Sequence, residues 1–439
     1  MYCRGRYVTL SWGQHMNRTE LTQLLAEAKE ARRNFDYFRA VALYSAILDS
    51  TEADTTDTAV KVIRQAALQE AGLVQRWLGN QDVTLACYEQ LQQEADSGQE
   101  QVVALTLLGM QYGRMGEYEK ALDLHQQARK LSDSLNFTKG RALTYQGIGA
   151  VLTFQGRYDE ALSRFQKARS LFDQIGDIEE LFRTWNWLGI VQARQGRVDK
   201  AIASFEKALY FARQSGVVQT AVALGNTGEA YQQLFAMEQA LTYHEEALAL
   251  LQKAELPPQE IDARRNMGVE LCYLGQPEKG ITYLEDALFT SRMYSEQDLE
   301  LQSLYSLALV ELDMGQTDRA AKHARALQEI AQTRKMRGYQ AQALHLAGLC
   351  RQAAGERIEA EQVWQQALFL AHETGQQSLL WQLHAALAAV SENPALAATH
   401  NQIAAEVIDQ IVYPIEDEVL RQTFLNAPPV KAVLRQVGG

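Results

Sequence analysis

A small residue recurs about every 40 positions through the middle of this chain of 439 residues. The successive positions are separated by 40, 40, 39, 40, 40 and 40 residues, which is regular enough to define a repeat. These positions are Gly109, Gly149, Gly189, Gly228, Gly268, Ala308 and Gly348. A period of this length is typical of a chain that stacks one supersecondary unit many times. Length is therefore no guide here to the number of globular domains.

Two more registers of small residues follow within each unit. Twelve residues after the first come Ala121, Ala161, Ala201, Ala240, Gly280, Ala320 and Ala360. Seven residues later the positions are Ala128, Ala168, Ala208, Ala247, Ala287, Leu327 and Ala367. Because glycine inside a helix costs about 1 kcal/mol relative to alanine, a glycine held at one register indicates close helix packing. Turns are marked by Gly116, Gly156, Gly196, Gly275, Gly315 and Gly355. The pattern predicts antiparallel helix pairs, which need neighbouring pairs to bury their apolar faces.

Composition and charge exclude several classes of protein. The net charge of −12, from 42 basic and 54 acidic residues, disfavours general binding to a phosphate backbone, so we expect no nucleic-acid partner. Four scattered cysteines (Cys3, Cys87, Cys272 and Cys350) without a CxxC pair are typical of reduced thiols in a cytoplasmic protein. No stretch reaches the roughly 18–20 apolar residues of a membrane span, and no secretory signal is apparent. We predict a cytoplasmic protein.

Catalytic and cofactor motifs are absent from the sequence. There is no HExxH, no GxxxxGK[ST], no strand-led GxGxxG and no GxSxG. His125 and His244 occupy the register that holds Phe165, Phe205 and Trp364 in other units, which predicts a packing role for both. The sequence therefore predicts a protein that is not an enzyme and has no catalytic residue, cofactor or metal site.

The regularity of the registers divides the chain. Residues 101–378 form seven regular units, whereas residues 17–100 and 379–413 carry imperfect ones. Residues 1–16 differ from everything that follows and are interpreted as a disordered or non-native extension. Residues 414–439 are expected to hold a short helix and a tail. That tail either covers the apolar face of the last unit or docks as a detachable peptide in the protein's own groove.

The unit resembles a known repeat family. Leu188-Gly189, the run from Gly196 to Ala201, and Phe205 with Ala208 together resemble the tetratricopeptide repeat. The usual unit has about 34 residues, so the longer unit is similar to the repeats of Pins-type adaptors and of bacterial signal-transduction arms. The resemblance implies an all-α solenoid, a right-handed superhelix of antiparallel helix pairs with a concave groove. It is specific for fold and only weakly specific for function.

The first helix of each pair is expected to line the groove. Counted from the small residue, the positions three before, one after and five after should face it. With flanking residues, the candidate partner-binding set is Arg114, Gln146, Phe154, Arg183, Asn186, Arg194, Asn226, Gln233, Arg265, Asn266, Tyr273, Tyr305 and His345. The resemblance implies that the asparagines and arginines of this set hold a ligand, since amides pair with peptide groups and guanidinium groups with carboxylates. A merely solvated polar helix face is the alternative.

The function that follows is a binding module. We predict a non-catalytic scaffold or adaptor, for example an assembly factor, that holds an acidic or polar segment of a partner protein. The alternative is a regulatory sensor arm that binds a small molecule or short peptide, as the aromatic groove residues Phe154, Tyr273 and Tyr305 suggest. An enzyme is the least favoured class. The sequence leaves the identity of the partner and the oligomeric state open.

Overall fold

Helices account for all the regular structure in the part of the chain that the computed structural model describes, residues 16–33, 36–51 and 56–437. Within these ranges there are twenty-two helices and no strand, so the predicted all-α class of helix pairs is confirmed. The chain divides into two compact units, Met1–Asp177 and Ile178–Gly439. Apart from Met16, the predicted N-terminal extension lies outside the described residues.

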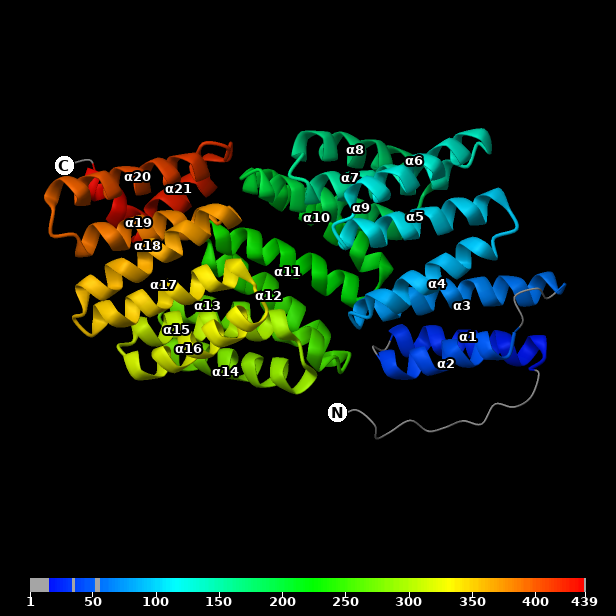
Figure 1. Cartoon of the computed structure of the whole chain (residues 1–439), viewed down its shortest axis with the longest axis horizontal. Coiled ribbons are helices and arrows are strands. Elements are labelled where there is room, and N and C mark those ends of the chain that lie inside the picture. Colours follow the sequence, from blue (N-terminus) through cyan, green and yellow to red (C-terminus); the bar gives the residue numbers. More distant parts are fainter. Residues whose placement is uncertain (1–15, 34–35, 52–55, 438–439) are drawn as a thin grey trace. The chain divides into compact units, whose positions relative to one another are not determined.

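Unit 1 contains four helix pairs, each made of an odd-numbered first helix and an even-numbered second helix (Figure 1). Ser97 and Glu100 begin α5 with a reciprocal capping box, which satisfies backbone N–H groups that a helix start would leave unpaired. The helices are α1 (Arg18–Arg33), α2 (Tyr37–Asp49), α3 (Thr58–Trp77), α4 (Gln81–Gln93), α5 (Gly98–Arg114), α6 (Tyr118–Ser134), α7 (Thr138–Phe154) and α8 (Tyr158–Ile175).

Unit 2 continues the same plan with six more pairs and then ends in two short helices. Prolines occupy the first turn of α13, α14 and α20, where the missing N–H costs nothing. The helices are α9 (Ile178–Arg194), α10 (Val198–Ser215), α11 (Val217–Gln233), α12 (Met237–Lys253), α13 (Pro257–Tyr273), α14 (Pro277–Tyr294), α15 (Gln297–Asp313), α16 (Thr317–Thr333), α17 (Arg337–Ala353), α18 (Arg357–Thr374), α19 (Gln377–Val390), α20 (Pro394–Val412), α21 (Glu418–Asn426) and α22 (Pro428–Val437).

The first small-residue register is explained by a large side chain sixteen positions further on. A Cβ atom added to Gly189 would lie 2.4 Å from the ring of Phe205, and one added to Gly348 would lie 2.2 Å from Nε1 of Trp364. His125 and His244 fill the same position above Gly109 and Gly228, and both histidines are fully buried. The unit whose small residue is alanine, Ala308, has the small Ala324 at the partner position. Helix contact in each pair is thus set by complementary volumes.

Within the seven regular units, one turn between paired helices departs from the glycine pattern. Gly196 and Gly275 adopt left-handed φ angles of 75° and 80°, as the other turn glycines do. At the α11–α12 turn the residue is Phe235, whose φ of 58° is strained for a bulky side chain. Its ring lies 5.9 Å from the ring of Tyr273 and 5.7 Å from that of Phe424, between ring centroids. These contacts compensate the backbone strain.

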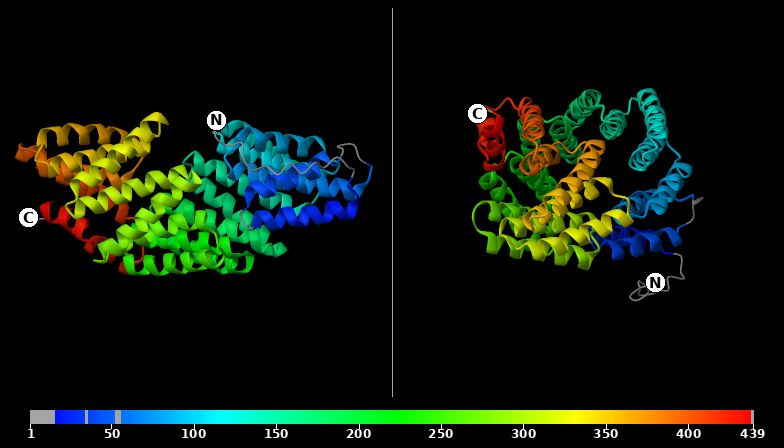
Figure 2. Two further views of the ribbon diagram at one scale, coloured as in Figure 1. Left: turned by 90° about the horizontal axis from the view of Figure 1, so that it is seen from below. Right: turned by 60° about the vertical axis from the view of Figure 1, so that its left-hand side comes forward.

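The C-terminal segment folds back on the start of unit 2. The carboxylate of Asp199 accepts hydrogen bonds from the backbone N–H groups of Glu416 (2.8 Å) and Asp417 (3.2 Å), and Lys200 pairs with Glu416 at 2.6 Å. Figure 2 shows this red segment beside green helices of the same unit. The buried side chains of α21 and α22 join a core cluster that also contains residues of α10, α18 and α20: Val198, Trp364, Ile408, Phe424, Val430 and Val433.

Candidate functional site

Two hollows lie on the first helices of unit 2. The smaller, which we name the Arg194 hollow, has a volume of about 340 Å³ between α9 and α11. Arg194 is exposed in it, and among the described residues no acidic side chain forms a salt bridge with its guanidinium group. The lining residues are Ile190, Ala193, Arg194, Phe205, Asn226, Glu229, Ala230 and Gln233.

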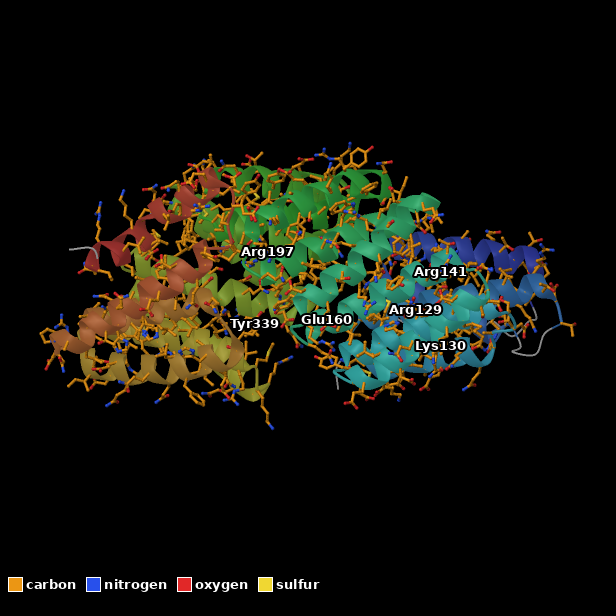
Figure 3. The ribbon with its side chains drawn as sticks, turned by 90° about the horizontal axis from the view of Figure 1, so that it is seen from above. Arg129, Lys130, Arg141, Glu160, Arg197 and Tyr339 are labelled. Carbon is orange, nitrogen blue, oxygen red and sulfur yellow. The ribbon has the colours of Figure 1, made fainter. Side chains whose placement is uncertain are left out.

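The larger hollow, which we name the Tyr305 hollow, has a volume of about 430 Å³. Its walls are rich in side-chain amides and phenols: Gln302 donates to the hydroxyl of Tyr339 (3.3 Å), and Gln342 donates to Gln376 (3.4 Å). Tyr339, labelled in Figure 3, comes from the beginning of α17. The lining residues are Arg265, Gln302, Tyr305, Ser306, Gly338, Tyr339, Gln342 and Gln376.

A polar side-chain network connects the two hollows. Arg265 of the Tyr305 hollow pairs with Asp262 at 2.7 Å and with Glu229 of the Arg194 hollow at 3.5 Å. Burial alone would lower the pKa of Arg265, but these two carboxylates raise it overall. Burial also raises the pKa of Glu229, and the neighbouring charge of Asp262 adds to that rise. The guanidinium group at the centre of the groove is therefore already neutralised by acids of the protein itself.

A second polar contact continues this line along the first helices. Asn226 donates from Nδ2 to Oδ1 of Asn186 at 2.6 Å, joining two residues that are 40 positions apart. We name the surface formed by the Arg194 hollow, the Tyr305 hollow and these connecting residues the unit 2 groove.

Two predicted groove residues of unit 2 lie beneath its surface. Asn266 is fully buried, with its amide nitrogen 3.5 Å from Glu229. His345 is buried as well: its Nδ1 lies 3.4 Å from the hydroxyl of Tyr305, and its carbonyl accepts the indole N–H of Trp364 at 3.1 Å. Burial lowers the pKa of His345 to about 4, so this imidazole is neutral at physiological pH.

The other predicted residues of unit 2 lie at different places. Arg194, Asn226, Gln233, Arg265 and Tyr305 line the two hollows. Arg183 pairs with Glu179 and Glu180 on its own helix, outside the hollows. Tyr273 ends α13 and is 39% exposed beside Phe235.

The three predicted residues of unit 1 lie at different depths. Arg114 and Phe154 are exposed at the ends of α5 and α7, whereas Gln146 is buried. Cationic side chains gather instead around Tyr145, where the guanidinium carbon of Arg129 lies 4.9 Å and Nζ of Lys167 lies 5.7 Å from the ring centroid. Arg129, Lys130 and Arg141 are labelled on this part of Figure 3.

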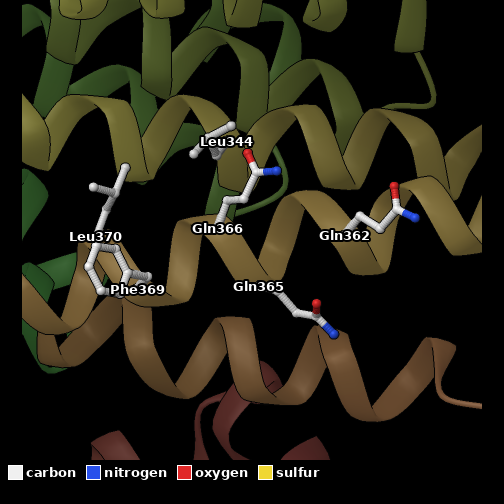
Figure 4. Close-up of a pocket in the computed structure, with 6 residues that line it drawn as sticks. All are labelled: Leu344, Gln362, Gln365, Gln366, Phe369 and Leu370. Carbon is white, nitrogen blue, oxygen red and sulfur yellow. The ribbon is translucent and has the colours of Figure 1, made fainter.

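A third hollow of about 600 Å³ lies between α17 and the outer side of α18. Figure 4 shows its lining, in which the exposed Phe369 lies beside Leu370 at one end and Gln362, Gln365 and Gln366 extend along α18 from there. These side chains lie on α18, the second helix of its pair. The unit 2 groove lies on first helices, so this hollow is separate from it.

Sequence reasoning missed several residues of the Tyr305 hollow. Gln302 and Gln342 both stand six positions before the small residue of their units, a register that had not been assigned to the groove. Their recurrence at an interval of 40 was the available signal. Gln376 precedes α19, where the regular registers end, and no periodicity points to it.

The chemistry of the unit 2 groove is that of recognition. Amides, phenols and one exposed guanidinium group provide hydrogen-bond donors and acceptors, and burial raises the pKa of Tyr305 and Tyr339, which stay neutral. No group of three histidine, cysteine or acidic side chains in the described residues is placed to hold a metal ion. Over the same residues, no helix is both long and apolar enough to cross a membrane.

Comparison with known proteins identifies the repeat. A model of the tetratricopeptide repeat matches residues 100–174 and 180–253, whereas no curated protein matches the chain. A Rap protein complexed with competence and sporulation factor is similar at a TM-score of 0.50 and 14% identity, covering 88% of this chain and 100% of that one. The apo form of the quorum sensor NprR from B. thuringiensis has a TM-score of 0.56 and 12% identity, covering 80% and 99%. At these identities both likenesses bear on the fold. Together with the stacked helix pairs, they show that this chain has the fold of tetratricopeptide-repeat proteins, and the family model identifies the repeat itself over residues 100–174 and 180–253.

Proposed function

We propose that this protein is a non-catalytic adaptor that holds an extended segment of a partner protein in the unit 2 groove. The observation that best supports this proposal is that the ion pair between Arg265 and Glu229 links the Tyr305 hollow to the Arg194 hollow. Packed helices lie about 10 Å apart, so a groove crossing the five first helices from α9 to α17 would hold roughly ten extended residues.

The side chains of the groove favour a polar segment with little net charge. Gln302, Gln342 and Asn226 offer amides that can pair with peptide N–H and C=O groups. Because Arg265 is already paired with two carboxylates, it offers little to an added acid. Arg194 is the exposed guanidinium group of the groove and would hold one carboxylate at the α9 end. The partner segment is thus polar, with an acidic anchor at one end.

A peptide library displayed on phage tests this proposal. Peptides selected on the wild-type chain should lose affinity about tenfold or more with Asn226→Ala or Gln342→Ala, since each removes paired donors in a desolvated site. Arg194→Ala should weaken only those peptides that carry a terminal acidic residue. Arg213→Ala, which changes an exposed arginine on α10, is the matched control. Selected peptides that bind every variant equally would refute the groove assignment.

The likeness to the two solved structures supports ligand binding by this fold, because one is a Rap protein complexed with competence and sporulation factor and the other is a quorum sensor. A specific observation also favours a second candidate, a sensor arm for a short peptide or small molecule. The rings of Tyr273, Phe235 and Phe424 lie in one contact series from α13 to the C-terminal segment. A ligand that displaces Tyr273 would act on the docking of that segment.

Hydrogen exchange distinguishes the two candidates. A sensor should show altered protection of residues 414–437 when a selected peptide binds, and a Phe424→Ala variant should abolish that change. An adaptor should show protection in the groove alone, with the C-terminal segment unaffected. In either case ligand binding should raise the melting temperature, since the ligand binds the folded state.

A further inference from the structure

Three of the eight histidines come together on three consecutive helices of unit 2. His372 lies on α18, His384 on α19 and His400 on α20. The Nδ1 atoms of His384 and His400 are 2.9 Å apart, and their ring centroids are separated by 5.1 Å. The ring of His372 lies 6.4 Å from that of His384, edge to face.

This spacing is close to the one that a shared metal ion requires. Zinc binds imidazole nitrogen at about 2.0–2.1 Å, so two nitrogens on one tetrahedral ion lie roughly 3.3 Å apart, with ring centres about 5 Å apart. The ring centroids of His384 and His400 already have that separation. The two Nδ1 atoms are 2.9 Å apart, so a small outward turn of both rings would bring them to the separation that the ion needs.

We propose that His384 and His400 bind one divalent transition-metal ion, of the kind that favours imidazole ligands, between α19 and α20. Imidazole suits Zn²⁺, Ni²⁺ and Cu²⁺, whereas Mg²⁺ and Ca²⁺ favour oxygen. No group of three ligands is already assembled in the described residues, so water completes the coordination. The exposed side chain of His372 can turn to provide a third nitrogen.

The surroundings allow a cation to enter. His384 is buried, but His400 is half-buried and His372 is exposed, so the cluster opens to solvent on that side. Glu361 of α18 places its negative charge near His400. Two or three imidazoles with water form a weaker site than the four-ligand structural zinc sites, and we expect micromolar affinity.

Sequence reasoning predicted no metal because the three histidines follow no ligand motif. They are spaced by 12 and 16 residues, so each comes from a different helix and only the packing of α18, α19 and α20 unites them. The inference is independent of the proposed function, because these histidines line neither hollow of the groove.

Titration of the full-length, metal-free protein with Ni²⁺ and Zn²⁺ by calorimetry tests the proposal. One equivalent should bind, and His400→Asn should weaken binding tenfold or more, because a single imidazole remains. His384→Asn should do the same, while His372→Asn should weaken binding less. His323→Asn, which changes a half-buried histidine paired with Glu311, is the matched control and should leave binding unchanged.

A second readout separates metal binding from mere packing. Metal should raise the melting temperature of the wild type by several degrees and leave that of the His384→Asn/His400→Asn double variant unchanged. His400 is half-buried, so we expect the His400→Asn variant to fold. This variant keeps the proposal testable even if the His384 variants unfold. Equal metal uptake by the wild type and the double variant, or no binding tighter than about 1 mM, would overturn the proposal in favour of a hydrogen-bonded pair.

Discussion

Substitution of Gly348 by alanine probes the volume complementarity of the helix pairs. The new Cβ would lie 2.2 Å from Nε1, 2.5 Å from Cε2 and 2.6 Å from Cδ1 of Trp364. Since ordinary contact begins near 3.4 Å, the indole must retreat by about 1.2 Å. Trp364 is fully buried and its N–H donates to the carbonyl of His345, so that movement disturbs both packing and a hydrogen bond.

The expected cost follows from three opposing contributions. Overpacking of a buried site costs about 1–3 kcal/mol, and the weakened hydrogen bond adds about 1 kcal/mol. Alanine in place of glycine returns about 1 kcal/mol in helix propensity. We therefore expect a net destabilisation of about 2 kcal/mol at α17 and α18. Gly225→Ala is the matched control, because nothing lies within 4 Å of its added Cβ, and it should stabilise α11 by about 0.5–1 kcal/mol.

Local stability is the appropriate measurement, because repeat arrays need not unfold as one cooperative body. Hydrogen exchange followed by mass spectrometry gives the opening free energy of each helix pair, and thermal melting gives the sum. The two glycine variants should shift their own helices in opposite directions. If Gly348→Ala leaves α17 and α18 as protected as in the wild type, or if both variants destabilise equally, the volume argument is wrong.

Three further predictions concern single positions. Burial lowers the pKa of fully buried His125 from 6.5 to about 4, so the unfolded chain takes up the proton first. The free energy of unfolding should therefore fall by up to about 3 kcal/mol as the pH drops from 6.5 towards 4. Urea unfolding measured across this pH range should show that His125→Phe removes this pH dependence. An equal pH dependence in the wild type and the variant would contradict the prediction. Ala201→Glu should cost several kcal/mol by placing a charge at a fully buried helix contact, and a near-wild-type melting temperature would show the register to be misassigned. Asp199→Ala should destabilise the docked C-terminal segment by about 1.5–3 kcal/mol, because it removes the acceptor of two backbone N–H groups. Amide hydrogen exchange over residues 414–437 should become faster. Unchanged protection there would show that the docking does not depend on this carboxylate.

The periodic part of the fold could be predicted because each unit repeats one packing solution. Gly189 and Gly348 stand where a glycine costs helix stability, and that cost marks the contact with Phe205 and Trp364. The same register gave the packing role of His125 correctly, since this imidazole is fully buried above Gly109.

The groove was less predictable, because a helical register gives the direction of a side chain and not its depth. Arg265 and Tyr305 reach the Tyr305 hollow, but His345, at the same register one unit later, is buried beneath it. Gln376 lies in the connection between α18 and α19, to which none of the three registers assigns a residue, and it reaches the hollow through tertiary packing. The residue-level assignment of a bound segment stays a prediction.

The docking of the C-terminal segment on Asp199 was outside the reach of periodicity, because it joins residues 217 and 218 positions apart. A linear array couples each repeat only to its neighbours, so it can grow and melt unit by unit. Here Val198 of the first pair of unit 2 shares one core cluster with Phe424 and Val430, so this core is completed only after residues 414–437 have been made. We expect a nascent chain that has not yet reached residue 414 to be prone to aggregation and dependent on chaperones, although most of its repeats are already formed.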